Sequence, residues 1–204
     1  MRRAVAATCL VTALGCVSLH GPKDVPPGDG PLVGLYRAAI ADASGTVRHV
    51  KLLLWAGPPD RLHAELLSPF GAVRFVLDAG GGAACVVDLA QSIAYSGPAG
   101  PQAVEGLVGL PVSIEDAVGA LLLGTTPEGL RVERHGGAAG DLPDQFVIAD
   151  NHRTLELTRV RLDRGGTSSA TIGTGRAPPG MTERPLDQLP AASGMAGVGS
   201  GAER

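Results

Sequence analysis

The side chains with the widest chemical range in this sequence belong to five histidines and three cysteines. The histidines do not have the spacing at which histidines share a metal ion; they stand at positions 20, 49, 63, 135 and 152. His63 and Glu65 match the His-x-Glu part of zinc deaminase sites, but no Pro-Cys-x-x-Cys segment follows. The sequence also lacks a Gly-x-Ser-x-Gly turn and a phosphate-binding loop. We therefore expect no catalytic residues, metal or cofactor, and a protein that binds rather than an enzyme.

Cys16 has the most specific predicted chemistry. Two arginines precede an uncharged apolar stretch over residues 4–15, which is too short to span a bilayer and is typical of a signal peptide. Gly15 directly before Cys16 resembles the lipobox of bacterial lipoproteins, in which cleavage before the cysteine is followed by acylation. We expect covalent acyl lipid on Cys16. The alternative is ordinary secretion with an incidental cysteine.

The surroundings of Cys16 also bear on location and partners. Val17 follows the cysteine in place of the aspartate that retains many lipoproteins in the inner membrane. We therefore expect a lipid anchor in the outer membrane, facing the periplasm of a Gram-negative bacterium. Cys85 would be the only cysteine with a free thiol in a mature chain, because Cys9 leaves with the signal peptide and Cys16 is acylated; this predicts a buried thiol and no disulfide. A net charge of −3 without a basic block argues against nucleic acid as a partner.

The stretch Ser68-Pro69-Phe70-Gly71 predicts a tight turn between two apolar strands. Proline fixes its own φ, and Gly71 accepts the positive φ that such a turn requires. Phe70 would then stand at the tip of a hairpin and point away from the sheet. An exposed aromatic ring there is unfavourable unless something apolar docks on it.

Short alternating segments predict the elements that would hold these residues. Hairpin-length links join six strands in an antiparallel meander, at 34–42, 46–55, 61–67, 72–79, 83–89 and 92–96. A short helix is expected within 97–111 and a second one over 113–123. The second has capping-box spacing at Ser113 and Asp116 and an apolar side that includes Ile114, Val118 and Leu121. Further strands are expected at 129–135, 144–150, 153–163 and 168–174.

This order of elements predicts a mainly β (α+β) fold: a curved antiparallel half-barrel of about ten to eleven strands with a helical lid or plug. The half-barrel domain is expected over 32–175. It would follow a signal peptide at 1–15 and a Pro/Gly-rich tether at 16–31, and precede a Pro/Gly-rich, largely disordered tail at 176–204.

The turn at 68–71 and the segment GLPVSIEDAVGALLLG at 109–124 together resemble the LolB family. These are outer-membrane lipoproteins that receive other lipoproteins from the carrier LolA and insert them into the membrane. The family turn is Asn-Pro-Leu-Gly, with a protruding leucine needed for insertion. Pro69 and Gly71 match it directly, and Phe70 takes the leucine position. Gly109-Leu110-Pro111 matches the approach to the family's lid helix.

The likeness covers about residues 32–175 and implies how such a protein would work. Pro69, Phe70 and Gly71 would form a loop that inserts into membrane or escorts acyl chains, and Ile114, Val118 and Leu121 would line the lid and cavity. The expected partners are membrane lipid, acyl chains of lipoproteins or other lipids, and a LolA-like periplasmic carrier, with the chain itself a monomer. The alternative is a non-catalytic structural or assembly lipoprotein of the same fold, in which the same residues pack in a filled core.

Overall fold

The computed structural model describes residues 32–68, 70–164 and 174–190. Within these residues the chain is mainly β, with ten strands, two α-helices and the short 3-10 helix η2. In chain order they are β1 (Leu32–Ala41), β2 (Val47–Gly57), β3 (Arg61–Leu67), β4 (Val73–Gly80), β5 (Ala83–Asp88), β6 (Ile93–Pro98), α1 (Pro101–Val108), α2 (Ile114–Leu123), β7 (Arg131–His135), β8 (Gln145–Ala149), β9 (Thr154–Arg164), β10 (Thr182–Pro185) and η2 (Leu186–Gln188).

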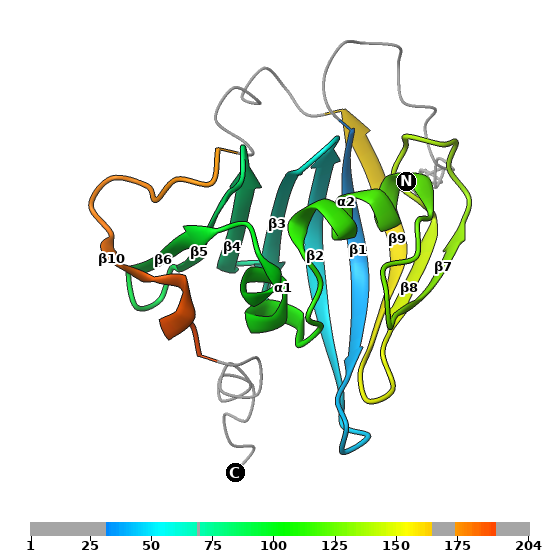
Figure 1. The fold of residues 1–204 in the computed structure, drawn as a ribbon, viewed down its shortest axis with the longest axis horizontal. Coiled ribbons are helices and arrows are strands. Elements are labelled where there is room, and N and C mark those ends of the chain that lie inside the picture. The colour runs from blue at the N-terminus through cyan, green and yellow to red at the C-terminus, as the bar shows by residue number, and fades with distance from the viewer. Residues whose placement is uncertain (1–31, 69, 165–173, 191–204) are drawn as a thin grey trace, which may run out of the picture.

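All ten strands belong to one sheet, in the order β10-β6-β5-β4-β3-β2-β1-β9-β8-β7. The six-strand meander is confirmed, and β9 returns beside β1 to carry β8 and β7 at the far edge. The sheet is not closed, because β10 and β7 form two separate edges (Figure 1). It is also mixed rather than antiparallel throughout, since β10 runs parallel to β6.

The parallel strand β10 lies in a region that the sequence assigns to a disordered tail. All four of its residues are exposed, so it has no apolar alternation that could have indicated a strand. Its anchor is the next residue, Leu186, which is only 4% exposed and packs against Gly97 of β6. The strand expected at 168–174 lies outside the described residues except for Thr174, which is not in a strand.

Alternation along the strands gives the sheet two distinct faces. Residues such as Leu54, Ala64 and Leu77 lie on the face that α1 and α2 cover, which we call the inner face (Figure 1). The main core lies between this face and the two helices. On the opposite, outer face, Cys85 belongs to a smaller apolar cluster and is fully buried, as the sequence predicts.

Local chemistry sets the limits of both helices. α1 has proline in its first turn and ends at Gly109, which adopts a left-handed φ of 83°. The Ser113 hydroxyl oxygen accepts a hydrogen bond from the Asp116 N–H at the start of α2, at 3.1 Å. Gly124 ends α2 with φ 72°. The predicted cap and stop of the second helix are therefore confirmed.

Candidate functional site

An apolar cavity of about 70 Å³ lies between the helices and the inner face of the sheet. Ala117 and Leu121 of α2 and Val104, Leu107 and Val108 of α1 contribute to its wall. The strands and the connection between the helices supply the other lining residues, all of them apolar: Leu52, Leu54, Leu62, Ala64, Leu66, Leu77, Leu110, Val112, Phe146, Ile148, Leu155 and Leu157. The cavity can therefore hold a small apolar group but offers no hydrogen bond to it.

The predicted helix positions do not all reach this cavity. Leu121 lines it, whereas Ile114 and Val118 are packed in the adjoining core, with exposures of 0% and 1%. The sequence does not by itself place α1 at the cavity, although the spacing of Val104, Leu107 and Val108 gives this helix one apolar side. That side was the signal that could have located the remainder of the cavity.

Arg134 of β7 ties the end of α2 to the sheet. Its Nε donates to the Leu121 carbonyl at 2.9 Å, and its Nη2 donates to the carbonyls of Ala138 and Asp141 at 2.7 Å each. A guanidinium at a helix C-terminus satisfies carbonyls that have no partner in the helix and complements the helix dipole. No spacing rule in the sequence indicates this contact, because it depends on how β7 packs against α2.

The turn at the tip of the β3–β4 hairpin exposes Phe70. Its side chain is 98% exposed, whereas the other two phenylalanines, Phe75 and Phe146, are buried in the core. Gly71 donates its N–H to the Ser68 carbonyl at 2.9 Å and adopts φ 84°. The positive φ and the exposed ring are as the sequence predicts. Pro69 lies outside the described residues, and so does Cys16.

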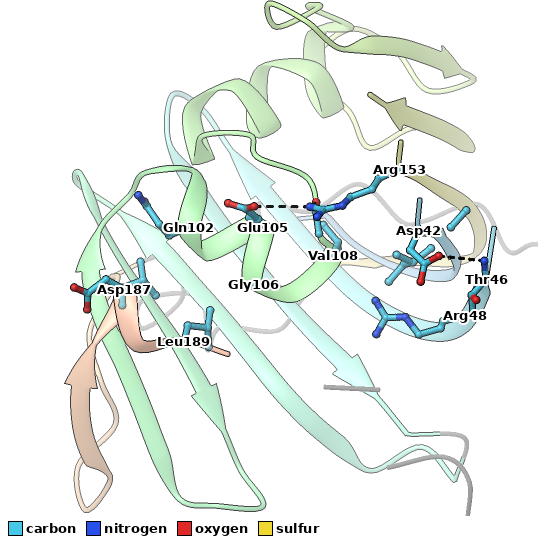
Figure 2. A pocket seen from close by; sticks show the side chains of 14 residues that line it. Asp42, Thr46, Arg48, Gln102, Glu105, Gly106, Val108, Arg153, Asp187 and Leu189 are labelled. Carbon is cyan, nitrogen blue, oxygen red and sulfur yellow. Dashed lines mark hydrogen bonds and ion pairs between the residues drawn. The ribbon is translucent and has the colours of Figure 1, made fainter. Parts of the chain in front are cut away.

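A second, larger pocket of about 400 Å³ lies beside the C-terminal end of α1 (Figure 2). Arg153 reaches α1 from the β8–β9 connection, where its Nη1 lies 3.8 Å from a Glu105 carboxylate oxygen and donates to the Gly109 carbonyl. On the β1–β2 hairpin, Asp42 accepts hydrogen bonds from the N–H groups of Ser44 and Thr46. The Ser44 hydroxyl bond, with these N–H bonds and the nearby Arg48 charge, lowers the pKa of Asp42.

His63 and Glu65, the half-match to a deaminase site, lie on the outer face of the sheet. The His63 ring makes hydrogen bonds to Asp78 at 3.1 Å and to Glu65 at 3.2 Å. Burial alone would lower the pKa of His63, but these hydrogen bonds and the two carboxylate charges outweigh it and raise the pKa to about 9. The other oxygen of Asp78 accepts from the N–H groups of Thr174 and Gly175. This cluster fastens a chain segment to the sheet.

No protein-family model matches this sequence, and no curated protein matches it at a significant level. Among the described residues, no group of histidines, cysteines and carboxylates is arranged to hold a metal ion. None of the helices in that part of the chain is long and apolar enough to cross a membrane. The likeness to LolB therefore rests on the two motifs and on the order of elements.

Proposed function

We propose that this chain is a lipid-anchored protein of the outer membrane that binds acyl chains, or lipidated proteins through their acyl chains, in an apolar half-barrel. Insertion of lipoproteins into the membrane is the activity that its likeness to LolB suggests. The observation that carries the proposal is the apolar cavity between α1, α2 and the inner face of the sheet. Its lining recognises a hydrocarbon by burying it and offers nothing to a polar ligand.

The size of the cavity implies that the helices move when a chain binds. An apolar cavity of about 150 Å³ admits benzene, and this cavity measures about 70 Å³. An acyl chain therefore requires α1 and α2 to rise from the sheet as a lid. Gly109, between the two helices, and Gly124, at the end of α2, both adopt positive φ. Glycine tolerates changes of backbone angle that other residues resist, which suits a hinge.

Phe70 gives the proposed protein its contact with the membrane. Its ring is exposed at a turn that the hydrogen bond from the Gly71 N–H to the Ser68 carbonyl closes. The space beside Gly71 is also open, since a Cβ added there would have no atom within 4 Å. Burying a phenylalanine side chain in lipid contributes roughly 1.5–3 kcal/mol. Acyl lipid on Cys16 would hold the chain at the membrane surface, so that this tip needs only to dip into it. A LolA-like carrier would deliver the cargo to a monomer.

The alternative is a structural or assembly lipoprotein with a filled core. The small cavity and the complete burial of Ile114 and Val118 favour it, because an apolar helix face packs against a sheet in many proteins without any ligand. In that case the helices would stay in place and the cavity would be an ordinary packing defect.

Native mass spectrometry separates the two functions. The full chain with Cys16→Ser is purified without detergent and titrated with the uncharged fluorescent probe N-phenyl-1-naphthylamine. A co-purified lipid, or saturable uptake of one probe per chain, is expected for an acyl-chain carrier. A mass without lipid, together with no uptake of the probe, would identify the structural protein.

A further inference from the structure

The pocket beside α1 is amphipathic. Its floor is apolar and is formed by Ile40 of β1, Val108 of α1, and Leu186 and Leu189 from η2 and the residues after it. Its rim is polar, with Thr46 of the β1–β2 hairpin and Gln102 of α1 between charged groups (Figure 2). At about 400 Å³ it is several times larger than the apolar cavity. An amphipathic pocket of this kind suits a ligand with a polar and an apolar part.

The charges on the rim are mixed rather than of one sign. Two guanidinium groups, from Arg48 and Arg153, and three carboxylates, from Asp42, Glu105 and Asp187, line the same pocket. In Figure 2, Arg48 extends from β2 towards α1, and Arg153 approaches α1 above it in this view and meets Glu105. A purely anionic ligand would lie near three carboxylates, and a purely cationic one near two guanidinium groups. A ligand that carries both charges is complementary to the rim.

The pocket and the apolar cavity share one residue of their walls. Val108, in the last turn of α1, lines both of them. The next residue, Gly109, also lines the pocket and is the site at which Arg153 holds the end of α1. The pocket and the cavity therefore adjoin at Val108, and a chain that displaces this side chain would run from one into the other. If α1 turns about Gly109, the same movement opens both.

We propose that this pocket binds the zwitterionic polar head of an amphiphile whose hydrocarbon chain enters the cavity past Val108. The proposal rests on the proposed acyl-chain binding and adds the class of head group that the site selects. Arg48 contacts the negative group of the head, and Glu105 contacts the positive group. Both side chains are only partly buried, so their groups can exchange partners with a ligand without leaving an unpaired charge in the core.

Three probes with the same dodecyl chain test the inference. Dodecylphosphocholine, dodecyl sulfate and dodecyltrimethylammonium are titrated into the full chain with Cys16→Ser by calorimetry, each below its critical micelle concentration. Dodecylphosphocholine is expected to bind about tenfold more tightly than either singly charged probe at about 0.15 M salt. Similar affinities for all three overturn the inference.

Two variants assign the charges to residues. Arg48→Gln is expected to weaken binding of dodecylphosphocholine and dodecyl sulfate by about tenfold and to spare dodecyltrimethylammonium. Glu105→Gln is expected to weaken dodecylphosphocholine and dodecyltrimethylammonium instead. Arg131→Gln is the matched control, because Arg131 is exposed on β7 and does not line the pocket. Equal effects of Arg48→Gln and Arg131→Gln also overturn the inference.

The test of the head-group site can fail while the test of acyl-chain binding succeeds, so the two results can be distinguished. If the uncharged naphthylamine probe binds but the three head groups are not distinguished, the acyl cavity stands and the head-group site is wrong. If the naphthylamine probe does not bind and no dodecyl probe binds, both the cavity and the head-group site are wrong. Melting temperatures of Arg48→Gln and Glu105→Gln within a few degrees of the unmutated chain show that their affinities report on binding rather than on folding.

Discussion

At the scale of single residues, Phe70 and His63 show how exposure and burial assign different roles. The Phe70 side chain is almost fully exposed at the hairpin tip, whereas His63 is held between two carboxylates on the outer face of the sheet. Exposure of the Phe70 ring to water is unfavourable, so the ring is suited to contact with an apolar partner. The two carboxylates favour the protonated form of His63, so the stability of the fold depends on pH.

Phe70→Glu is expected to weaken liposome association of the Cys16→Ser chain by about tenfold, because the phenylalanine contributes roughly 1.5–3 kcal/mol when buried in lipid. Stability should change by no more than about 0.5 kcal/mol, as for other exposed positions. Phe70→Leu, which restores the residue of the LolB turn, is the control and should keep the association. Cosedimentation with vesicles measures the first effect and urea unfolding the second. Unchanged cosedimentation of Phe70→Glu would show that the tip does not contact membrane.

The pKa of His63 predicts a loss of stability at alkaline pH. Its folded-state pKa is raised from 6.5 to about 9, so the charged ring stabilises the fold fully below pH 6.5 and this contribution is lost as pH rises through 9. The shift corresponds to an effect on the order of 3 kcal/mol. Urea unfolding between pH 6 and pH 10 should show this decline, and His63→Gln should flatten it. His135→Gln, on the exposed end of β7, should leave the decline in place. A curve for His63→Gln as steep as that of the unmutated chain contradicts this assignment.

At the scale of elements, the segment 174–190 joins the two faces of the sheet. It begins at Asp78 on the outer face, where Ala177 and Met181 cover the apolar cluster around Cys85. It then pairs with β6 at one side of the sheet (Figure 1). It ends on the inner side, where Leu186 joins the main core and Leu189 packs against Gly106 of α1. This segment therefore supports α1 through the packing of Leu189 against it.

A double-mutant cycle at Gly106 and Leu189 tests that packing. A Cβ on Gly106 would overlap the Leu189 side chain, so Gly106→Ala is expected to destabilise the fold by about 1–3 kcal/mol through overpacking. In a Leu189→Ala background the obstacle is absent, and Gly106→Ala should stabilise α1 by about 0.5–1 kcal/mol because alanine favours a helix over glycine. Urea unfolding of the four proteins measures the coupling. The same effect of Gly106→Ala in both backgrounds would mean that this end of the segment does not pack on α1.

At the scale of the whole molecule, the features that repeat along the chain could be predicted from sequence. Strand alternation predicts the meander, and a capping residue with an apolar side predicts α2. The glycine of the Phe70 turn is equally local, since it needs only its own positive φ.

Features that depend on one contact between distant segments could not be predicted. β10 is four exposed residues fixed by Leu186, and the end of α2 is held by Arg134 from a strand that follows it. The amphipathic pocket combines residues of β1, β2, α1 and η2, none of which has a pattern that indicates a shared site. Local periodicity describes elements, whereas these features depend on how the elements meet.

If hydrocarbon binds in the cavity between the helices and the sheet, filling that cavity with Ala117→Leu should prevent the binding. Ala117 lines the cavity, so a leucine there would fill much of the 70 Å³ and should leave stability unchanged or raise it by about 0.5–2 kcal/mol. Ala39→Leu, the same change on the outer face of β1, is the control.

The measurement is the affinity of N-phenyl-1-naphthylamine for the Cys16→Ser chain with and without Ala117→Leu. Acyl-chain binding predicts saturable uptake by the unfilled protein and an affinity lower by about tenfold or more in Ala117→Leu, with a melting temperature at or above that of the parent. Ala39→Leu should bind as the parent does. No uptake by the parent, or equal uptake by Ala117→Leu, contradicts the claim and leaves a protein with a filled core.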